Sequence, residues 1–309
     1  MITIEDIIRA GERTEKHIIK TPLIRLENGD DKLGCIVYIK AENLQRTGSF
    51  KLRGAVNKIL SLSPEEISKG FVCASSGNHG RAVAYAAARL GTEATVVIPE
   101  TAPEVKIDGI KSLGAEVVLC PATERFKTAE EICRNLGATL IPPYNDEFVM
   151  AGQGTAGLEI AEQLPEADTV IVPVSGGGLI GGVATALKES IPGIKVCGVE
   201  PANLPRYSES LKAGKPVEVE FKPTVADALV SQKPGPLCFP QVQKYVDEVV
   251  TVSEEGIKEA WSFLLKECKI LAEPSSCTGI AAVMEGKIKV KPEEKVCFLI
   301  SGGNVGINI

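Results

Sequence analysis

The sequence predicts an α/β fold in which helices cover both faces of open, mostly parallel sheets. Short apolar runs alternate with helical segments that end at glycine, and several of these runs lead directly into glycine-rich turns. Strands buried on both faces are apolar throughout, and right-handed crossovers place helices on both sides of the sheet. The composition, 44% hydrophobic and 24% charged, is that of an ordinary globular protein, and 309 residues suggest about two domains.

The N-terminal part of the chain predicts one helix and one short strand. Thr3 can cap a helix that runs to about Lys16, with Asp6 as its capping-box partner. The pattern breaks at residues 21–23, because proline disfavours helical backbone in the residue before it. The apolar residues 37–40 predict the strand.

The alternation becomes regular from Phe71 onwards. Just before it, Ser63 opens a helix with proline at the first position and two acids in the first turn. The following helices end at glycines, which accept the left-handed backbone of a helix end. We expect strands at residues 71–74, 94–98 and 116–119, and helices at residues 81–90, 103–113 and 128–136 that end at Gly91, Gly114 and Gly137.

The same rhythm continues after Pro142 and Pro143. Residues 201–240 are rich in proline and less regular, so we expect helix and loop there without further detail. We expect strands at residues 169–174, 195–199, 249–252 and 296–300, and helices at residues 154–164, 179–191 and 254–266, the last capped by Ser253, with another opening at Glu273.

The break at Pro142 and Pro143 predicts a domain boundary. Residues 1–45 contain one predicted strand and cannot bury a core alone, so we expect them to pack with the C-terminal half. The expected organisation is a large discontinuous domain, residues 1–45 and 147–309, and a small mobile domain, residues 46–146, inserted into it. Ligands of such folds bind between the domains and at the carboxyl ends of the strands.

Charge and cysteine usage exclude several classes of function. The net charge of −6 and the lack of a basic patch argue against a nucleic-acid partner. Residues 169–187 carry no charge, but Pro173 and five glycines favour a strand, turn and helix over a membrane span. Nine cysteines without a C-x-x-C pair, and only two histidines, lack the spacing of a zinc site. With charged residues at the N-terminus in place of a secretory signal, we expect a cytoplasmic protein with reduced thiols.

The first candidate for chemistry is a lysine in residues 49–54, S-F-K-L-R-G. Lys51 stands between Phe50 and Leu52, and desolvation by such neighbours lowers the pKa of an amine. A neutral amine is a nucleophile that can form a Schiff base with an aldehyde. Taken alone, this stretch favours an ordinary surface lysine at a helix start over a catalytic one.

A glycine-rich turn, Ser175 to Leu179, lies between a predicted strand and a predicted helix. Its backbone N–H groups at a helix start favour an anion such as phosphate. The same region reads G-x-G-x-x-G through Gly176, Gly178 and Gly181, and the acid Glu200 follows a strand roughly 20 residues later, as in dinucleotide-binding proteins. A dinucleotide site, and a tight turn without a ligand, therefore remain alternatives.

Two further turns favour a different ligand. Residues 75–80, S-S-G-N-H-G, offer two hydroxyls, an amide and backbone N–H groups to a carboxylate or a phenolate oxygen. Residues 301–304, S-G-G-N, follow the last predicted strand. A dinucleotide does not explain these turns or the lysine. A small phosphorylated aldehyde on a ring explains all four features, because each meets a different group of such a molecule.

The four segments, in this order, resemble the pyridoxal-phosphate enzymes of the threonine/serine dehydratase and serine racemase family. Residues 151–155, A-G-Q-G-T, add to a resemblance that covers essentially the whole chain. It implies the two-domain tryptophan-synthase-β-like fold and pyridoxal 5′-phosphate as cofactor. It further implies these roles: Lys51 as Schiff-base lysine and catalytic base; Phe50 beside the cofactor; Asn78 on the ring hydroxyl; Gly176, Gly177, Gly178 and Leu179 on the phosphate; Ser301 on the ring nitrogen; and Ser75, Ser76, Asn78 and His79 near the substrate carboxylate.

The implied reaction is β-elimination from a hydroxy-amino acid such as L-threonine or L-serine, giving a 2-oxo acid and ammonia. Ser76 can be a second acid on the opposite face of the α-carbon, so a serine-type racemase remains open. A 3-hydroxyaspartate-type dehydratase and a hydroxyectoine-derived substrate remain open as well. Alternatives of another class are an NAD-dependent oxidoreductase and a non-catalytic amino-acid sensor.

Two positions depart from the family. Ser175 stands where the phosphate loop usually begins with glycine, and Arg206 stands where members that hold a divalent cation carry an acid six residues after Glu200. We therefore expect phosphate binding and no metal. We expect a homo-oligomer, dimer or tetramer, and no isoleucine feedback, because the chain ends just after Asn304.

Overall fold

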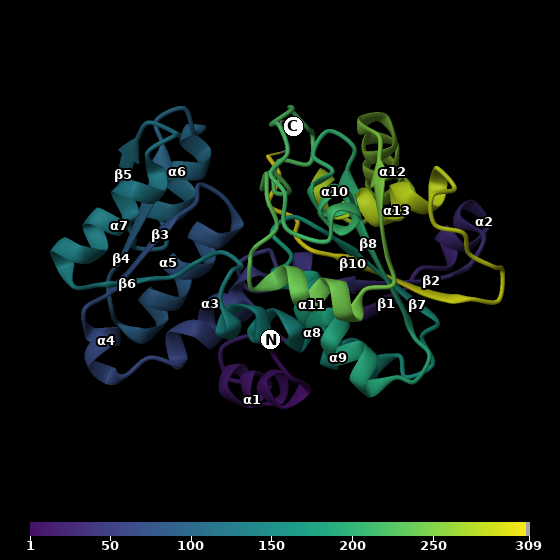
Figure 1. Cartoon of the computed structure of the whole chain (residues 1–309), viewed down its shortest axis with the longest axis horizontal. Helices are drawn as coiled ribbons and strands as arrows, with labels where there is room; N and C mark the ends of the chain where they lie inside the picture. Colours follow the sequence, from purple (N-terminus) through teal and green to yellow (C-terminus); the bar gives the residue numbers. More distant parts are fainter. Residues whose placement is uncertain (307–309) are drawn as a thin grey trace.

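The computed structural model describes residues 1–306, and residue 105 by its backbone alone. Two sheets form two bodies that lie side by side, with the helix of residues 51–60 between them (Figure 1). The larger sheet has the strand order β1 (Leu23–Arg25), β2 (Ile36–Ala41), β10 (Lys295–Ile300), β7 (Thr169–Pro173), β8 (Lys195–Pro201) and β9 (Glu248–Val252). The smaller sheet has the order β5 (Glu116–Cys120), β4 (Ala94–Pro99), β3 (Phe71–Ala74) and β6 (Thr139–Leu140).

Nearly all of this pairing is parallel. In the large sheet β1 pairs antiparallel with β2, and the other neighbouring strands run parallel. The small sheet is parallel throughout. The carboxyl ends of parallel strands meet at one edge of a sheet, so the turns that follow β3, β7 and β10 gather at the edges where ligands bind.

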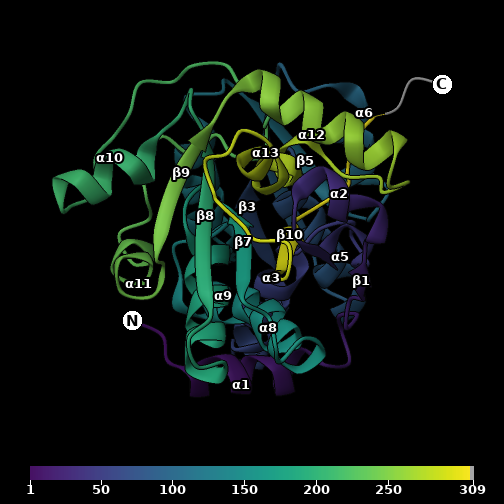
Figure 2. The same ribbon diagram turned by 90° about the vertical axis from the view of Figure 1, so that its right-hand side faces the viewer.

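Both faces of the large sheet carry an apolar core. Val170 and Val172 of β7 join the core formed with α8 (Glu147–Gln163), α9 (Gly178–Ser190) and α11 (Cys238–Tyr245). Ile171, between them, joins the opposite core with α12 (Glu254–Lys266) and α13 (Thr278–Met284). Figure 2 shows these two layers on either side of the sheet. The alternation follows from the two-residue period of a strand, with both faces buried.

The small sheet is covered in the same way. One of its cores contains residues of α3 (Lys51–Leu60), α5 (Asn78–Leu90) and α6 (Glu104–Lys111), and the other contains residues of α7 (Arg125–Leu136). The remaining elements are α1 (Ile4–Thr14), η1 (Glu27–Gly29), α2 (Asp30–Leu33), η2 (Glu42–Leu44), α4 (Pro64–Ser68), α10 (Arg206–Ala213) and η3 (Pro274–Cys277).

Helix α3 is held against the large body by glycine contacts and a buried ion network. A Cβ at Gly54 would lie 2.7 Å from the Val149 carbonyl oxygen, and one at Gly152 would lie 2.5 Å from the Arg53 carbonyl oxygen. The fully buried Arg53 donates from Nε to Glu42 Oε2 over 2.7 Å and from Nη1 to Glu159 Oε1 over 2.6 Å. These contacts fix the helix that begins at Lys51 against the strands and helices around it.

The predicted fold class is confirmed, and most strands and helices lie within a few residues of the prediction. Helix α1 has the expected Thr3–Asp6 capping box. Helix α8 begins seven residues earlier than predicted, because Asp146 caps it by accepting from the Val149 N–H group. Strands β1 and β6 were not predicted, since two or three residues carry no periodic signal. The domain boundaries at 45/46 and 146/147 stay predictions. Within residues 1–306, no helix combines the length and apolar character needed to cross a bilayer.

Candidate active site

The lysine segment and the last glycine turn are joined through their backbones. Ser49 forms an antiparallel bridge with Gly302, and the Phe50 N–H group donates to the Ser301 carbonyl over 3.0 Å. The start of α3 therefore lies directly beside the carboxyl end of β10, although about 250 residues of chain separate the two.

Lys51 lies at the first position of α3 with its amine inside the protein. Its Nζ donates to the Pro143 carbonyl over 2.7 Å and lies 5.1 Å from the centroid of the Phe50 ring. Burial lowers the pKa of the Lys51 amine from its ordinary value of 10.5 to about 8. This is the direction that its apolar neighbours predict, and it leaves a sizeable neutral fraction near pH 8. The described residues thus place a nucleophilic amine at the junction of the two bodies.

The glycine-rich turn at the start of α9 has no room for side chains. A Cβ at Gly176 would lie 2.4 Å from the Tyr144 ring, and one at Gly178 would lie 2.7 Å from Gln153 Oε1. Gly177 has φ +98°, and its Cβ would lie 1.8 Å from Tyr207 Oη. The first N–H groups of a helix have no carbonyl partner within the helix, so the turn presents free donors to an anion.

A shared acceptor links this turn to the lysine. Gln153 Nε2 donates over 3.4 Å to the same Pro143 carbonyl that accepts from Lys51. The other end of that amide, Oε1, faces Gly178 and has no hydrogen-bond partner within residues 1–306. The lysine and the residues around the glycine turn are therefore connected through one shared acceptor.

Arg206 and Tyr207 support the glycine turn from behind. Tyr207 Oη donates to the Gly176 carbonyl over 3.1 Å. The buried Arg206 donates to the Val174 carbonyl over 2.9 Å and to the Leu229 carbonyl over 3.0 Å. Its Nε lies 3.9 Å from Oε2 of Glu200, and burial raises the pKa of that carboxyl. The Arg206 guanidinium thus lies beside the Glu200 carboxyl group. The described residues contain no group of three or more histidines, cysteines or acids that could bind a metal ion. The expected absence of a metal stays a prediction.

The Asn78 side chain is held from two sides. Its Nδ2 lies 3.0 Å from each oxygen of the Glu273 carboxyl group, and its Oδ1 accepts from Asn304 Nδ2 over 2.8 Å. Asn304 also donates to the Thr47 carbonyl over 2.8 Å, beside the lysine segment. The turn that follows β3 of the small sheet is therefore tied to the end of the large sheet.

Glu273 lies beside the candidate site, and the sequence analysis did not single it out. It was predicted only as the opening of a helix, whereas its carboxyl group is buried and lies against Gly302 and Asn78. Burial raises the pKa of the Glu273 carboxyl from 4.5 to about 7. The one available signal was an acid directly before a proline and two small polar residues, which is equally the signal of a helix start.

Ser301 is oriented by a second serine that the sequence did not indicate. The hydroxyl groups of Ser301 and Ser276 lie 2.9 Å apart, and Ser276 Oγ accepts from the Gly302 N–H group over 2.8 Å. Both serines are buried. The Ser301 hydroxyl is thus a fixed, neutral hydrogen-bonding group at the carboxyl end of β10.

The remaining predicted residues lie in the turn between β3 and α5. Ser75 Oγ accepts from the Gly77 N–H group over 3.3 Å, and Ser76 is half-buried. His79 lies deeper, with Nε2 at 2.8 Å from the Ile141 carbonyl, and burial lowers its pKa to about 3, so the ring is neutral. Because the imidazole ring is neutral and its Nε2 is already hydrogen-bonded to the Ile141 carbonyl, His79 provides no positive charge for a substrate carboxylate. A carboxylate bound here would be held by the N–H groups and hydroxyl groups of the turn. The substrate role of His79 stays a prediction.

The donor set fits a phosphorylated aldehyde with an aromatic ring. It comprises an amine of lowered pKa, a helix start without side chains, an amide for a ring hydroxyl and a fixed hydroxyl for a ring nitrogen. Gly181, the last glycine of the dinucleotide pattern, lies inside α9 and packs against Met150, where a Cβ would lie 3.3 Å from the sulfur. Close packing therefore explains this glycine, and the glycine lends no support to the dinucleotide alternative.

Comparison with known proteins agrees with this chemistry. Residues 14–302 match the family described as pyridoxal-phosphate dependent enzyme. The chain is 47% identical over 312 residues to an L-threonine ammonia-lyase of Thermotoga maritima, covering 100% of this chain and 77% of that protein. It is 42% identical to a serine racemase of Dictyostelium discoideum, covering 99% and 96%. The structure of a threonine deaminase from Solanum lycopersicum superimposes with a TM-score of 0.92 at 39% identity, covering 98% of this chain and 88% of that chain.

Proposed function

The chain belongs to the family of pyridoxal-phosphate-dependent enzymes, and we propose that it eliminates the β-hydroxyl group of L-threonine or L-serine, giving a 2-oxo acid and ammonia. The observation that carries this proposal is the position of Lys51. Its amine, of lowered pKa, lies where the glycine turn of α9, the Ser301 turn and the Asn78 turn meet. The names of the threonine ammonia-lyase relatives support the choice of substrate.

The cofactor is assigned to the residues that fit its groups. We assign the aldehyde to Lys51, the phosphate to the turn of Gly176, Gly177, Gly178 and Leu179, the ring hydroxyl to Asn78 and the ring nitrogen to Ser301, with Phe50 beside the ring. When bound, pyridoxal phosphate supplies an electron sink for the negative charge that develops at the α-carbon of the substrate.

Lys51 is the base of the proposed reaction. With a pKa of about 8, roughly a quarter of the amine is neutral at pH 7.5, against about one part in a thousand at an ordinary pKa of 10.5. The free amine takes the proton from the α-carbon, and the β-hydroxyl group takes up a proton and leaves the neighbouring carbon as water. Addition of water to the resulting enamine then releases ammonia and the 2-oxo acid. The Ser301 hydroxyl, held by Ser276, would offer the ring nitrogen a neutral hydrogen-bond partner in place of a charged one.

The turn after β3 is proposed to hold the substrate carboxylate. It opens α5, whose N-terminal N–H groups favour an anion, and Ser75 and Ser76 add hydroxyl groups. The small body would move toward the large body when the amino acid binds, which excludes water from the reacting carbon. The contacts of Asn78 with Glu273 and Asn304 cross between the two bodies and make this turn sensitive to such a motion.

A serine-type racemase is the second candidate. Ser76 is half-buried in the same turn and is free to supply a proton on the face of the α-carbon opposite Lys51. The 42% identity to a serine racemase over nearly the whole chain supports this activity. Racemisation and elimination share the first proton transfer, so one site can support both.

The cellular location and the oligomeric state are also part of the proposal. We propose a cytoplasmic homo-oligomer, dimer or tetramer. The nine cysteines carry free thiols, and eight of them are buried, which suits a reducing compartment. Sedimentation of the purified protein tests the assembly, and a monomer at micromolar concentration would contradict it.

Ammonia release from a panel of amino acids tests the function. L-Threonine and L-serine are expected to give ammonia and a 2-oxo acid, with 3-hydroxyaspartate and the D-isomers as comparisons. Lys51→Ala should lower turnover by several orders of magnitude, because base and nucleophile vanish together. Lys58→Ala, which removes a lysine from the same helix, serves as the matched control and should keep most of the activity. Ammonia release by Lys51→Ala at the unaltered rate would refute the assignment. A protein that holds the cofactor and binds amino acids without releasing ammonia or inverting them would be a sensor.

A further inference from the structure

Helix α3 carries Lys51 at its first position, yet the helix begins without a capping side chain. Its N-cap residue is Phe50, whose side chain cannot accept a hydrogen bond from the first turn, and no acid lies in that turn. Capping side chains ordinarily satisfy the first N–H groups of a helix and fix where the helix begins. The position of the Lys51 amine therefore depends on contacts that hold α3 from outside the helix.

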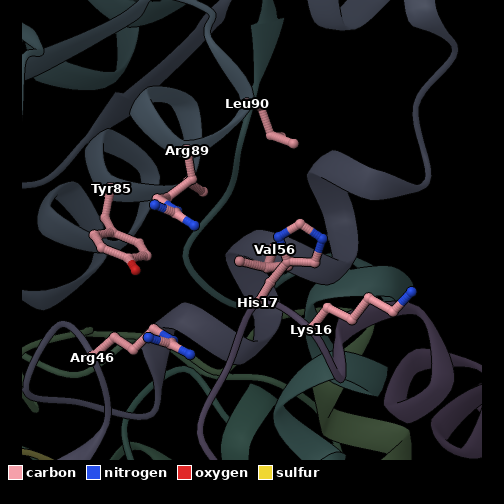
Figure 3. Close-up of a pocket in the computed structure, with 8 residues that line it drawn as sticks. Lys16, His17, Arg46, Val56, Tyr85, Arg89 and Leu90 are labelled. Carbon is pink, nitrogen blue, oxygen red and sulfur yellow. The ribbon is translucent and has the colours of Figure 1, made fainter.

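The two sides of α3 belong to different bodies. Val56 and Ile59 join the core of the small body with α5, and Val56 also lines, together with Tyr85 of α5, the small hollow that Figure 3 shows. The other side of the helix meets the large body through Arg53. The proposed movement of the small body would therefore pull on the helix that carries Lys51, and contacts on the large-body side must resist it.

Arg53 contacts the large body through its guanidinium group, which is fully buried. Nε and Nη2 donate to the two oxygens of Glu42 in η2, each over 2.7 Å. Nη1 and Nη2 donate to the two oxygens of Glu159 in α8, over 2.6 and 2.8 Å. A planar guanidinium group that is paired with a carboxylate on two sides is held in one orientation, which a flexible ammonium group would not provide.

The charges of this network balance inside the protein. Lys40 Nζ donates to Glu159 Oε2 over 2.5 Å, so two cations face two carboxylates. The side chains of Lys40, Glu42 and Arg53 are fully buried, and that of Glu159 is 13% exposed. Buried ion networks are often no more stabilising than apolar side chains of similar volume, so stability alone does not explain this one.

The network reaches the lysine through the backbone. The Arg53 N–H group donates to the Phe50 carbonyl, and the Phe50 N–H group donates to the Ser301 carbonyl, each over 3.0 Å. We propose that Arg53 is a positioning residue, which holds the first turn of α3 on the large body so that the Lys51 amine stays on the Pro143 carbonyl when the small body moves. This inference rests on the proposed function, in which Lys51 is the base.

Trace acetylation of the full-length, cofactor-free chain tests the proposal, because acetic anhydride reacts only with neutral amines. Peptide mass spectrometry gives the acetylation of Lys51 at each pH, and in the unaltered protein it should rise with a midpoint near pH 8. In Arg53→Lys, which keeps the charge and loses the planar group, the midpoint should move by about one unit or more toward 10.5, because a displaced amine gains water. The titratable groups around the amine, Cys238, Glu273 and His79, stay unaltered.

Two further variants control for buried charge and for general loosening of the helix. Glu42→Gln/Arg53→Met removes one positive and one negative charge together, so the pair of Lys40 and Glu159 remains balanced, and it should raise the midpoint as Arg53→Lys does. Lys58→Ala removes an ion pair from the last turn of the same helix and should keep the midpoint near pH 8. Thermal unfolding of each variant separates a loss of stability from a displacement of the lysine.

Three results would overturn the proposal. The first is an unchanged midpoint in Arg53→Lys and in the double variant together with a lowered Tm, which would make the network purely structural. The second is an equal rise in Lys58→Ala, and the third is a midpoint near 10.5 in the unaltered protein. Acetylation needs neither cofactor nor turnover, so a raised midpoint in the Arg53 variants without ammonia release by the unaltered protein would support the positioning role and refute the proposed reaction instead.

Discussion

Replacement of Gly177 by alanine should damage the protein more than the same change at another left-handed glycine. Gly177 has φ +98° and ψ −5°, a backbone conformation that costs a residue with a Cβ about 1–2 kcal/mol. The added Cβ would also lie 1.8 Å from Tyr207 Oη. Tyr207 is fully buried and cannot swing into solvent. Overpacking of this kind costs about 1–3 kcal/mol, and displacement of the phenol breaks its bond to the Gly176 carbonyl, worth about 0.5–1.5 kcal/mol.

Gly214 supplies the matched control. It has φ +68°, and among residues 1–306 no atom outside its immediate chain neighbours lies within 4 Å of the position that its Cβ would take. Gly214→Ala therefore carries the backbone cost alone, about 1–2 kcal/mol. The difference between the two variants should be roughly 2–4 kcal/mol, which corresponds to about 3–6 °C in Tm for a protein of this size.

Thermal unfolding and dialysis measure the two consequences. Gly177→Ala should unfold at a lower temperature than Gly214→Ala and should lose pyridoxal phosphate more readily on dialysis. Gly177→Asp should lose it most readily, because its carboxylate adds repulsion of the phosphate dianion. Equal Tm values for Gly177→Ala and Gly214→Ala, with equal cofactor retention, would refute the reasoning about the glycine turn.

Three further predictions follow from the site. Ser76→Ala should lower racemisation by about 10²–10⁴-fold and leave elimination from the L-substrate largely intact. Chiral chromatography measures the first rate, and coupled reduction of the 2-oxo acid measures the second. A parallel fall of both rates would make Ser76 a positioning residue instead. Glu273 has a raised pKa of about 7, so its stability contribution is present below pH 4.5 and is lost as the pH rises from there toward 7. Glu273→Gln should therefore gain in Tm relative to the unaltered protein between pH 5 and 8, and should lack an inflection near pH 7 in its kcat/KM profile; a Tm difference independent of pH would contradict the assigned pKa. Small-angle scattering should show a more compact particle when an amino-acid inhibitor is bound, whereas identical profiles would count against movement of the small body.

The sequence by itself determined the fold class, the order of most strands and helices, and the segments that form the candidate site. These features depend on short stretches of sequence. A strand is recognised by the two-residue period of its side chains, a helix by its capping residues, and a tight turn by glycines that adopt backbone conformations other residues avoid. Lys51 could be singled out because its neighbours in sequence are also among its neighbours in space, as the 5.1 Å to the Phe50 ring shows. The roles of these residues toward the cofactor follow from the family resemblance and not from any local pattern.

The tertiary structure alone decided how these segments support one another. Glu273 meets Asn78 across 195 residues of chain, and Asn304 meets it across 226. No periodicity or short motif records such pairs, because each partner looks locally like a helix start or a chain end. The sequence also gives no sign of the contact between Tyr207 and Gly177, because these two residues lie on elements that are distant in the chain. Local preferences set the elements, whereas burial and charge at the site depend on which distant side chains the packed cores bring together.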